Sequence, residues 1–461
     1  MSERALLVYI SIEGSDILVG RLWCRSGQGR PSTATFAYSD SWLDHPKAFE
    51  LSPALPLSKA PHHTSRAMPV VFSDCSPDSW GQRLMRRGER MRAENDARAS
   101  RSLAPVDFLI GVDDSSRMGA LRFRDTTDGN FLTCGGQPVP PLIELPALLN
   151  ASMKIDQGRE RNKDVALVLT PGASLGGARP KATVRDKDGS LLVAKFPKTD
   201  DQWPIIKWES IELELAEKAG IIVPNSRLES CAGKPVLLLS RFDRTPANGR
   251  IPFMSAMTSL DEDDHATRSY LDLVEVIRRY GSEPSKDLRQ LWRRVLFNTL
   301  SSNLDDHLRN HAFLWDGRGW VLSPAFDMNP VPSRETDFHK LTINESDATP
   351  SFELVVSVAS KFGLKKAEAI SIASDVASAL SDWRSVAKKH KLRPSEIDQM
   401  ASAFDHSDLR RASGTSPGTP QKTKSTIAKA PDASQKKKVD KKSGRPASKK
   451  GTAVAEGGKT K

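Results

Sequence analysis

Hydrophobic positions in the first part of the chain follow two different periods. LLVYISI, DILVGRLWC and MGALRF are short apolar runs bounded by turn residues such as EGSD, and they predict strands. PDSWGQRLMRRGERMRAENDARA instead places Trp80, Leu84 and Met85 at helical spacing with basic residues between them, which predicts a helix. Residues 1–150 are therefore predicted to form an N-terminal α+β subdomain, and nothing in it indicates a particular chemistry.

The pattern changes from about residue 164. There follow, in order, an apolar run, a glycine-rich loop, a strand, a helix and another strand: DVALVL, TPGASLGGARPKAT, SLLVAKFP, PIIKWESIELELAEKAG and KPVLLLSRFDR. In the helix, Ile206 and Leu213 lie near one stripe, and Gly220 stands where the residue after a helix C-cap is expected. Residues 151–260 are predicted to form a β-rich, nucleotide-binding lobe.

Helical periodicity dominates after about residue 266. SYLDLVEVIRRYG places Tyr270, Leu273, Val274 and Ile277 at positions i, i+3, i+4 and i+7. Further helices are predicted in KDLRQLWRRVLFNTLSSN, SFELVVSVASKFG, KKAEAISIASDVASALSDWRSVAKKHK and RPSEIDQMASAF. Residues 261–411 are thus predicted to be a helical lobe. A β-rich lobe followed by a helical lobe, with polar residues gathered at the junction, is one architecture for holding a nucleotide in a cleft.

Charge is distributed unevenly along the chain. The formal net charge is +11, and the segment from Ala412 onward carries 12 Lys and 1 Arg against 2 Asp and 1 Glu. The folded part is therefore nearly neutral. Residues 412–461 have no aromatic residue and are rich in Lys, Ser, Pro, Ala and Gly, so a disordered basic tail is predicted. It is interpreted either as an electrostatic arm for nucleic acid or another acidic partner, or as a solubilising extension.

Composition also bears on the compartment. No run of about 18 apolar residues occurs, so no segment is expected to span a membrane. MSERALLVYISIEGSD carries acidic residues inside and beside its apolar run and is interpreted as a first strand rather than a signal peptide. Four scattered cysteines without a CxxC pair disfavour a disulfide framework or structural zinc, and a cytoplasmic location is expected.

The segment NLDDHLRNHAFLWDGRGWVLSPAFDMNP carries the strongest chemical signal. Asp305 is followed five positions later by Asn310, and Asp327 comes seventeen residues beyond Asn310. Between them, AFLW and WVL flank DGRG and predict a β-hairpin. Protein kinases use this order: a base Asp, a metal-binding Asn, a hairpin and a second metal-binding Asp. Carboxylate and amide oxygens are also the ligands that Mg²⁺ prefers.

Two other interpretations of this segment stay open. Asp305 could cap a helix, with Asp316–Gly317 as an ordinary surface turn. Alternatively, His307 and His311, at i and i+4 beside two carboxylates, could belong to a metallohydrolase. That pattern lacks the Glu of H-E-x-x-H and has no obvious third ligand. The ordered set as a whole favours phosphoryl transfer.

The upstream lobe offers matching parts. Lys195 ends the apolar run LLVAK, and the helix beyond it offers Glu209 and Glu212 as ion-pair partners. A Lys at a strand end is often simply solvated. The loop GASLGGARPKAT has backbone freedom at its glycines, with Lys181 close behind, which suits a phosphate cradle. It is not a Walker A loop, because Ala178 stands where that pattern requires Lys, and it does not match G-x-G-x-x-G.

Taken together, these segments resemble the HipA-type toxin kinases over most of residues 1 to about 405. The resemblance rests on their joint occurrence in order: LSPALPLS, FSDCSPDSWGQRLMRR, GVDDSSRMGALRF, ASLGGARPKA, LLVAKF, LLLSRFDR, SNLDDHLRNHAFL and SPAFDMNP. It implies an α+β, two-lobed protein-kinase-like fold with an N-terminal α+β subdomain and a mostly helical C-terminal lobe. The tail has no counterpart in the resemblance.

The resemblance also implies roles for individual residues. Asp305 would be the catalytic Asp that orients the acceptor hydroxyl, and Asn310 and Asp327 would hold Mg²⁺, with His307 lining the same loop. Asp306 stands at a position that is often Gly in the family and receives no role. Lys195 would contact the phosphates, Gly176 to Lys181 would form the phosphate loop, and the backbone of Ser240 to Phe242 would hold adenine. The implied nucleotide-binding residues are Gly176, Gly177, Ala178, Lys181, Lys195, Ser240, Arg241, Phe242, His307 and Asn310.

Ser174 stands at the loop position that the family autophosphorylates, where the modification ejects the loop and switches the kinase off. A dianionic phosphate there would compete with the nucleotide phosphates for the same amides and cations. Without the resemblance, Ser174 would be interpreted as a residue that favours the turn.

The function that the resemblance implies is an ATP- and Mg²⁺-dependent serine/threonine kinase, the toxin of a toxin–antitoxin pair. It would phosphorylate a translation component, with an aminoacyl-tRNA synthetase as the expected target. A small HipB-like helix-turn-helix antitoxin that binds operator DNA would neutralise it. The alternative is a catalytically weak kinase-fold subunit of a DNA-bound repressor complex, against which stands the intact set Lys195, Asp305, Asn310 and Asp327.

Overall fold

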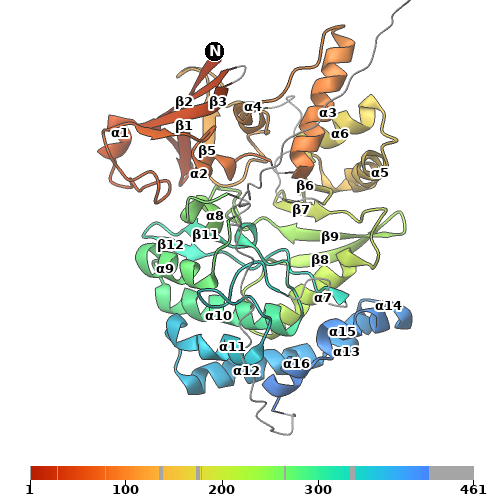
Figure 1. Cartoon of the computed structure of the whole chain (residues 1–461). Coiled ribbons are helices and arrows are strands. Elements are labelled where there is room, and N and C mark those ends of the chain that lie inside the picture. Colours follow the sequence, from red (N-terminus) through yellow and green to blue (C-terminus); the bar gives the residue numbers. More distant parts are fainter. Residues whose placement is uncertain are drawn as a thin grey trace, which may run out of the picture. The chain divides into compact units, whose positions relative to one another are not determined.

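A five-stranded antiparallel sheet, with strand order β4-β3-β2-β1-β5, forms the first part of the fold (Figure 1). The computed structural model describes residues 2–27, 30–77, 79–133, 139–172, 177, 179–263, 266–332 and 338–414. The strands are β1 Ser2–Ile12, β2 Ser15–Gly27, β3 Arg30–Tyr38, β4 His62–Thr64 and β5 Leu121–Arg124. The three predicted strands are confirmed as β1, β2 and β5. The sequence analysis missed β3, although its Ala34, Phe36 and Tyr38 alternate into the core.

Helices lie between the strands of this sheet along the chain and after β5. They are α1 Asp40–Leu43, α2 Val70–Ser73, α3 Ser79–Asn95, α4 Pro105–Ile110, the short 3₁₀ helix η1 Leu142–Glu144, α5 Leu145–Asp156 and α6 Asn162–Gly172. The predicted helix is confirmed as α3. The apolar run DVALVL forms part of α6, which buries Val165 and Val168. Helix α6 packs closely on α3. Gly88 of α3 allows this approach, because a β-carbon there would come within 2.9 Å of the Leu169 side chain.

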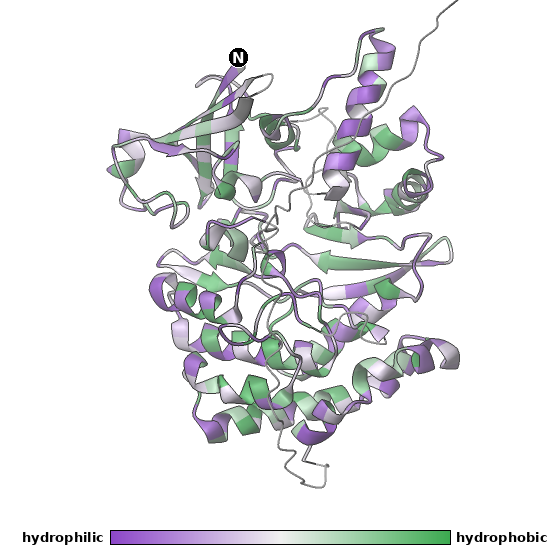
Figure 2. Ribbon diagram, in the orientation of Figure 1, coloured by the Kyte–Doolittle hydropathy of each residue, from purple (hydrophilic) through white to green (hydrophobic). Residues whose placement is uncertain are grey.

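A second antiparallel sheet, ordered β6-β7-β9-β8, contains β9, which Figure 2 colours as mostly hydrophobic. Its elements are β6 Lys181–Arg185, β7 Leu191–Lys195, β8 Ser226–Cys231 and β9 Lys234–Ser240, with α7 Ile205–Lys218 packed on β8 and β9. The predicted helix is confirmed as α7, and Gly220 follows its C-cap with a left-handed φ of 76°. Strand β6 begins inside the stretch predicted as a loop, because KATVR pairs along β7.

The third part is mostly helical, as predicted. A small sheet of β10 Phe253–Ser255, β11 Ala312–Trp315 and β12 Trp320–Leu322 contains the predicted hairpin. The helices are α8 Ala256–Ser259, α9 Tyr270–Tyr280, α10 Pro284–Leu300, η2 Leu308–Asn310, α11 Phe352–Ser357, η4 Ala359–Phe362, α12 Lys366–Ser381, α13 Trp383–Lys389, α14 Pro394–Gln399, α15 Ala401–Phe404 and α16 Ser407–Ala412. Trp208 of α7 packs against Trp383 and Phe404, with ring centroids 6.1 and 6.2 Å away. Apolar packing thus joins α7 to the last helices.

The described residues belong to one compact unit, Met1–Ser416. The predicted division of this unit at residues 150 and 260 stays a prediction, and the predicted tail lies outside the described residues from 415 onward. No helix in the described ranges has the length and apolar character needed to cross a bilayer. Cys24, Cys75 and Cys231 are free and buried.

A buried charge cluster ties the first part of the chain to the segment after β9. The carboxylate of Asp243 is 1% exposed and pairs with Arg241 and Arg244, each at 2.6 Å. It also accepts the Gly119 N–H at 2.7 Å. Burial alone would raise the pKa of Asp243, but the two guanidinium groups outweigh burial and hold the pKa below its ordinary value. The 111–119 loop and the 241–244 segment therefore share one ionised centre.

Replacing Asp243 by Asn is expected to destabilise the protein strongly, because it leaves two buried guanidinium groups without their anion. The expected loss is about 3–5 kcal/mol in the free energy of unfolding, measured by chemical denaturation at pH 7. The difference from wild type should shrink below pH of about 4, since a lowered folded pKa stabilises only above the ordinary carboxyl pKa. Asp125→Asn, in the exposed pair with Arg4, is the control and should cost under about 1 kcal/mol. Equal losses for the two variants would contradict this role of Asp243.

Candidate functional site

The side chain of Lys195, at the end of β7, connects three segments that are distant in sequence. Its ammonium forms a close ion pair with Glu209 of α7 and a second one, at 2.7 Å, with Asp327 in the segment after β12. Lys195 is only 7% exposed and Glu209 is fully buried, whereas the side chain of Asp327 is 35% exposed. A buried ammonium needs such anionic partners. Glu209 therefore takes the predicted pairing role, and Glu212, one turn further on, is fully buried, which raises its pKa well above its ordinary value.

The electrostatics of this cluster keep Lys195 and Asp327 charged, whereas burial raises the pKa of Glu209 despite the ammonium of Lys195. Burial alone would lower the pKa of Lys195, but the carboxylates of Asp327 and Glu209 outweigh burial and raise that pKa. The ammonium of Lys195, with a contribution from Lys181 and His307, holds the pKa of Asp327 well below its usual range. At neutral pH, Lys195 is cationic and Asp327 is anionic. The site can thus present a fixed positive charge beside a partly exposed carboxylate.

The backbone at Asp327 is unusual. Its φ of 59° lies in the left-handed region, which costs a residue other than glycine roughly 1 kcal/mol. Asp is among the residues that tolerate this conformation. The residue before it, Phe326, packs against Phe242, with ring centroids 5.4 Å apart. The strained backbone and the aromatic contact both hold the carboxylate of Asp327 at the end of Lys195, and such local strain is typical of functional sites.

The predicted catalytic loop alternates between exposed and buried residues. Asp305 is exposed, Asp306 is buried and His307 is partly exposed. Asn310 is 8% exposed, its backbone N–H donates to the His307 carbonyl at 2.8 Å, and its side-chain N–H donates to the Asp305 carbonyl at 3.4 Å. The amide nitrogen of Asn310 is thus engaged, which leaves its amide oxygen as the group that can bind a cation.

The residues present fit a magnesium ion held partly by phosphate. Asp327 and Asn310 offer hard oxygen ligands, and Asn329 adds a buried side-chain oxygen, Oδ1, with no hydrogen-bond partner in the described part of the chain. The sequence analysis gave no role to Asn329, although it stands two positions after Asp327. Within the described ranges, no group of three or more His, Cys, Asp and Glu side chains could hold a metal by itself. Mg²⁺ is usually bound by one or two carboxylates together with substrate phosphates, which matches this donor set.

Part of the predicted phosphate loop is described. Gly177 has a φ of 91°, and a β-carbon there would collide with the ammonium of Lys181. Its carbonyl accepts the Trp80 N–H at 3.3 Å, which ties the loop to α3. Lys181 of β6 lies directly opposite Lys195 of β7 in the strand register. The structure therefore brings Gly177, Lys181 and Lys195 together, whereas Ser174, Gly176 and Ala178 lie outside the described residues.

The segment predicted to bind adenine, residues 240–242, also makes structural contacts. The backbone N–H groups of Ser240 and Arg241 donate to the carbonyls of Asn225 and Leu191, at 2.8 and 3.1 Å. The side chain of Arg241 belongs to the buried cluster around Asp243. Adenine binding by this segment stays a prediction, and other groups of the segment, such as Phe242 beside Phe326, would have to supply the contacts.

The histidine pair of the metallohydrolase interpretation does not face one site. His311 is 2% exposed and its Nε2 lies 2.8 Å from the buried carboxylate of Asp306. His307 instead interacts electrostatically with Asp327. The two side chains are therefore engaged with different carboxylates, so the described residues give this interpretation no support.

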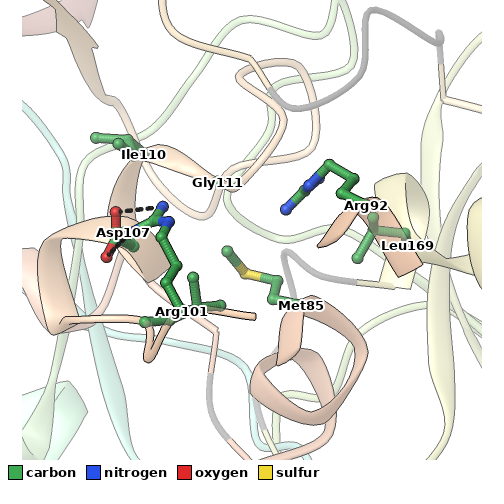
Figure 3. Close-up of a pocket in the computed structure, with 8 residues that line it drawn as sticks. Met85, Arg92, Arg101, Asp107, Ile110, Gly111 and Leu169 are labelled. Atoms are coloured by element: carbon green, nitrogen blue, oxygen red, sulfur yellow. Dashed lines mark hydrogen bonds and ion pairs between the residues drawn. The ribbon is translucent and has the colours of Figure 1, made fainter. Parts of the chain in front are cut away.

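A separate small cavity of about 130 Å³ lies between α3, α4 and α6 (Figure 3). Figure 3 shows Arg101 paired with Asp107, at 2.9 and 3.0 Å, on one side of the cavity and Arg92 on the other. None of its lining residues was predicted to belong to the site. The cavity shares no residue with the cluster around Lys195.

The cluster Lys195–Glu209–Asp327 has the composition expected of a protein-kinase site, and His307 of the loop from Asp305 to Asn310 interacts electrostatically with Asp327. The family model described as "HipA N-terminal domain" matches residues 10–123, and the one described as "HipA-like C-terminal domain" matches residues 173–383. The two matches occur in the expected order, the N-terminal model before the C-terminal one. The chain belongs to the family of HipA-type kinases.

Individual relatives agree with this assignment. Y4mE of Sinorhizobium fredii, named as a candidate kinase, is 26% identical over 336 residues, which is 67% of this chain and 75% of that protein. Y4dM of the same organism is 29% identical over 185 residues, 34% of this chain and 44% of that protein. A chain in the solved complex of Shewanella oneidensis HipA, HipB and operator DNA superimposes with a TM-score of 0.61 at 16% identity. The match covers 88% of this chain and 96% of that chain, and it shows a shared fold.

Replacing Asp327 by Asn should weaken Mg²⁺-dependent nucleotide binding selectively. The substitution removes the carboxylate of Asp327 while the Lys195–Glu209 pair remains. Affinity for ATP with Mg²⁺, measured by isothermal titration calorimetry, should fall by about 10-fold or more, the usual size of a lost charged hydrogen-bond partner. Binding in EDTA should change much less. Asp316→Asn, in the hairpin turn, is the control. Equal weakening with and without Mg²⁺ would contradict a metal-binding role for Asp327.

Proposed function

We propose that the protein is an ATP- and Mg²⁺-dependent serine/threonine protein kinase that acts as the toxin of a toxin–antitoxin pair. The observation that carries this proposal is the placement of Lys195 between Glu209 and Asp327. A cation paired with a helix carboxylate, beside a carboxylate that can hold Mg²⁺, is the arrangement that protein kinases use for phosphoryl transfer from ATP.

Each residue of the site has a distinct task in this reaction. The ammonium of Lys195 binds nucleotide phosphates and stays charged because its pKa is raised. Asn310 and Asp327 would hold Mg²⁺, which when bound neutralises charge on the transferring phosphoryl group. The carboxylate of Asp305 is exposed, so it can reach a hydroxyl on another protein, orient it and accept its proton. Lys181 beside Gly177 adds a second cation for the phosphates.

Self-modification at Ser174 is the proposed off-switch. A phosphate on the loop that leads to Gly177 and Lys181 would bring about two negative charges to cations that otherwise bind the nucleotide. The modification would then eject the loop and switch the kinase off. This proposal rests on the resemblance of the loop, since Ser174 lies outside the described residues.

The proposed partners are a HipB-like helix-turn-helix antitoxin, operator DNA and a protein substrate of the translation apparatus, with an aminoacyl-tRNA synthetase as the expected substrate. The solved Shewanella oneidensis complex, which contains HipA, HipB and operator DNA, supports the first two. The second candidate function, a kinase-fold subunit without turnover in such a complex, is favoured by the basic residues after Ala412.

Removing residues 413–461 tests whether the tail binds DNA. Full-length protein should bind duplex DNA with an affinity that falls steeply with salt, and the truncated protein should lose that binding. Fluorescence anisotropy at two or more salt concentrations measures both. DNA binding that survives truncation would assign the contact to the body of the protein, whose net charge is close to zero.

The kinase proposal is tested by intact mass and phosphosite mapping after incubation with ATP and Mg²⁺. The wild type should gain a phosphate on Ser174. Asp305→Asn should slow this by about 100-fold or more, because general base catalysis contributes roughly 10²–10⁴-fold. Ser174→Ala is the control for the site and should remain able to phosphorylate a protein substrate. A wild type that neither binds ATP nor gains a phosphate would overturn the proposal and favour the repressor-subunit function.

A further inference from the structure

Asp306 is the acidic residue of the catalytic loop for which the sequence offered no role. Its side chain is buried, at 3% exposure for the residue, although it stands directly after the exposed Asp305. Its Oδ2 accepts three hydrogen bonds: from the Tyr270 hydroxyl at 2.6 Å, the Asn298 amide at 2.9 Å and His311 Nε2 at 2.8 Å. One carboxylate oxygen therefore joins α9, the end of α10 and the residue that precedes β11.

The same network continues toward Asp327. The Oδ1 of Asn298 accepts the side-chain N–H of Asn303 at 3.0 Å. The Oδ1 of Asn303 in turn accepts the backbone N–H of Asn329 at 3.3 Å. A chain of hydrogen bonds thus leads from Asp306 to the segment that carries Asp327. The left-handed backbone of Ser302, with a φ of 57°, turns the chain from α10 into this loop, and its hydroxyl donates to the Ala403 carbonyl at 2.9 Å.

The charges that face Asp306 keep it ionised. Burial alone would raise its pKa, but His311, Tyr270 and His339 outweigh burial and lower it. The buried guanidinium of Arg294, on α10, also interacts with this carboxylate. Removing this carboxylate is expected to cost much free energy, because it leaves several buried donors unpaired.

We propose that Asp306 is a positioning residue that holds the catalytic loop so that Asp305 faces outward. This inference rests on the proposed kinase function. Successive side chains in an extended segment point to opposite sides, so an anchor that pulls Asp306 inward directs Asp305 and His307 outward. Through Asn298 and Asn303, the same anchor sets the position of the chain next to Asp327. Asp306 thereby fixes the spacing between the residue that orients the acceptor hydroxyl and the residue that holds the metal.

The test is a kinetic comparison of wild type, Asp306→Asn and Tyr270→Phe as full-length proteins with ATP and Mg²⁺. The readout is the first-order rate constant of Ser174 phosphorylation at saturating ATP, here called kcat, and the ATP concentration that gives half of that rate, here called KM. The amide nitrogen of Asp306→Asn brings a further donor into a site that already has three donors, from Tyr270, Asn298 and His311. We expect kcat to fall by about 10- to 100-fold, the effect of a displaced catalytic group. The KM for ATP should rise by less than kcat falls, because the substitution leaves Lys195 untouched. Tyr270→Phe removes one hydrogen bond and should lower kcat by about 3- to 10-fold.

A matched control separates positioning from stability. Asp408 is also a buried carboxylate, at 6% exposure, and it accepts the Phe352 N–H at 3.0 Å far along the chain from the loop. Asp408→Asn should lower the melting temperature without lowering kcat at a temperature where all variants are folded. The double variant Asp306→Asn/Asn298→Asp moves the carboxylate across the 2.9 Å contact and should recover part of kcat.

The outcomes are distinguishable. If the wild type binds ATP but transfers no phosphate to itself or to a protein, both the proposed function and this inference are overturned. An active wild type with an equally active Asp306→Asn variant would overturn the inference alone. If Asp306→Asn does not fold, Tyr270→Phe decides: wild-type kcat in that variant overturns the positioning role, and a selective loss of kcat supports it.

Discussion

The ammonium of Lys195, held between the carboxylates of Glu209 and Asp327, is the contact on which the rest of the site depends. It joins the end of a strand, the middle of a helix and a loop more than 130 residues further along the chain. Buried charges are costly unless they are paired, so each partner constrains the other two. The 35% exposure of Asp327 leaves one side of this cluster open to a ligand, and Glu209 anchors the other side in the core.

Two further buried carboxylates, Asp243 and Asp306, also join segments that are distant in sequence. Asp243 gathers two guanidinium groups and ties the 111–119 loop to the segment that follows β9. Asp306 gathers a hydroxyl, an amide and an imidazole under the catalytic loop. The apolar core brings the lobes together, and these ionised centres then set the positions of individual functional segments. Buried hydrogen-bond networks have this effect because displacing one member leaves the polar groups of the others unpaired.

Local pattern was sufficient for much of the fold and of the site. The strands β1 and β2, the helices α3, α7, α9 and α10 and the hairpin β11–β12 follow directly from hydrophobic period and turn residues. The order of Asp305, Asn310 and Asp327 indicated the chemistry. The contacts of Asp306 and Asp243 could not be predicted, because their partners lie up to 36 and 124 residues away and no local spacing encodes them. Strand β6 was missed because its pairing with β7 outweighs the glycine-rich context before it.

The most direct test of the central claim is a crystal structure of the protein with Mn²⁺ and a non-hydrolysable ATP analogue, with the metal located by anomalous scattering. We predict an anomalous peak for a Mn²⁺ ion that is bound by the carboxylate of Asp327, the amide oxygen of Asn310 and phosphate oxygens of the nucleotide. We also predict that the ammonium of Lys195 contacts the nucleotide phosphates while it keeps its pair with Glu209. A nucleotide bound away from Lys195, or a metal that does not touch Asp327, would contradict the account.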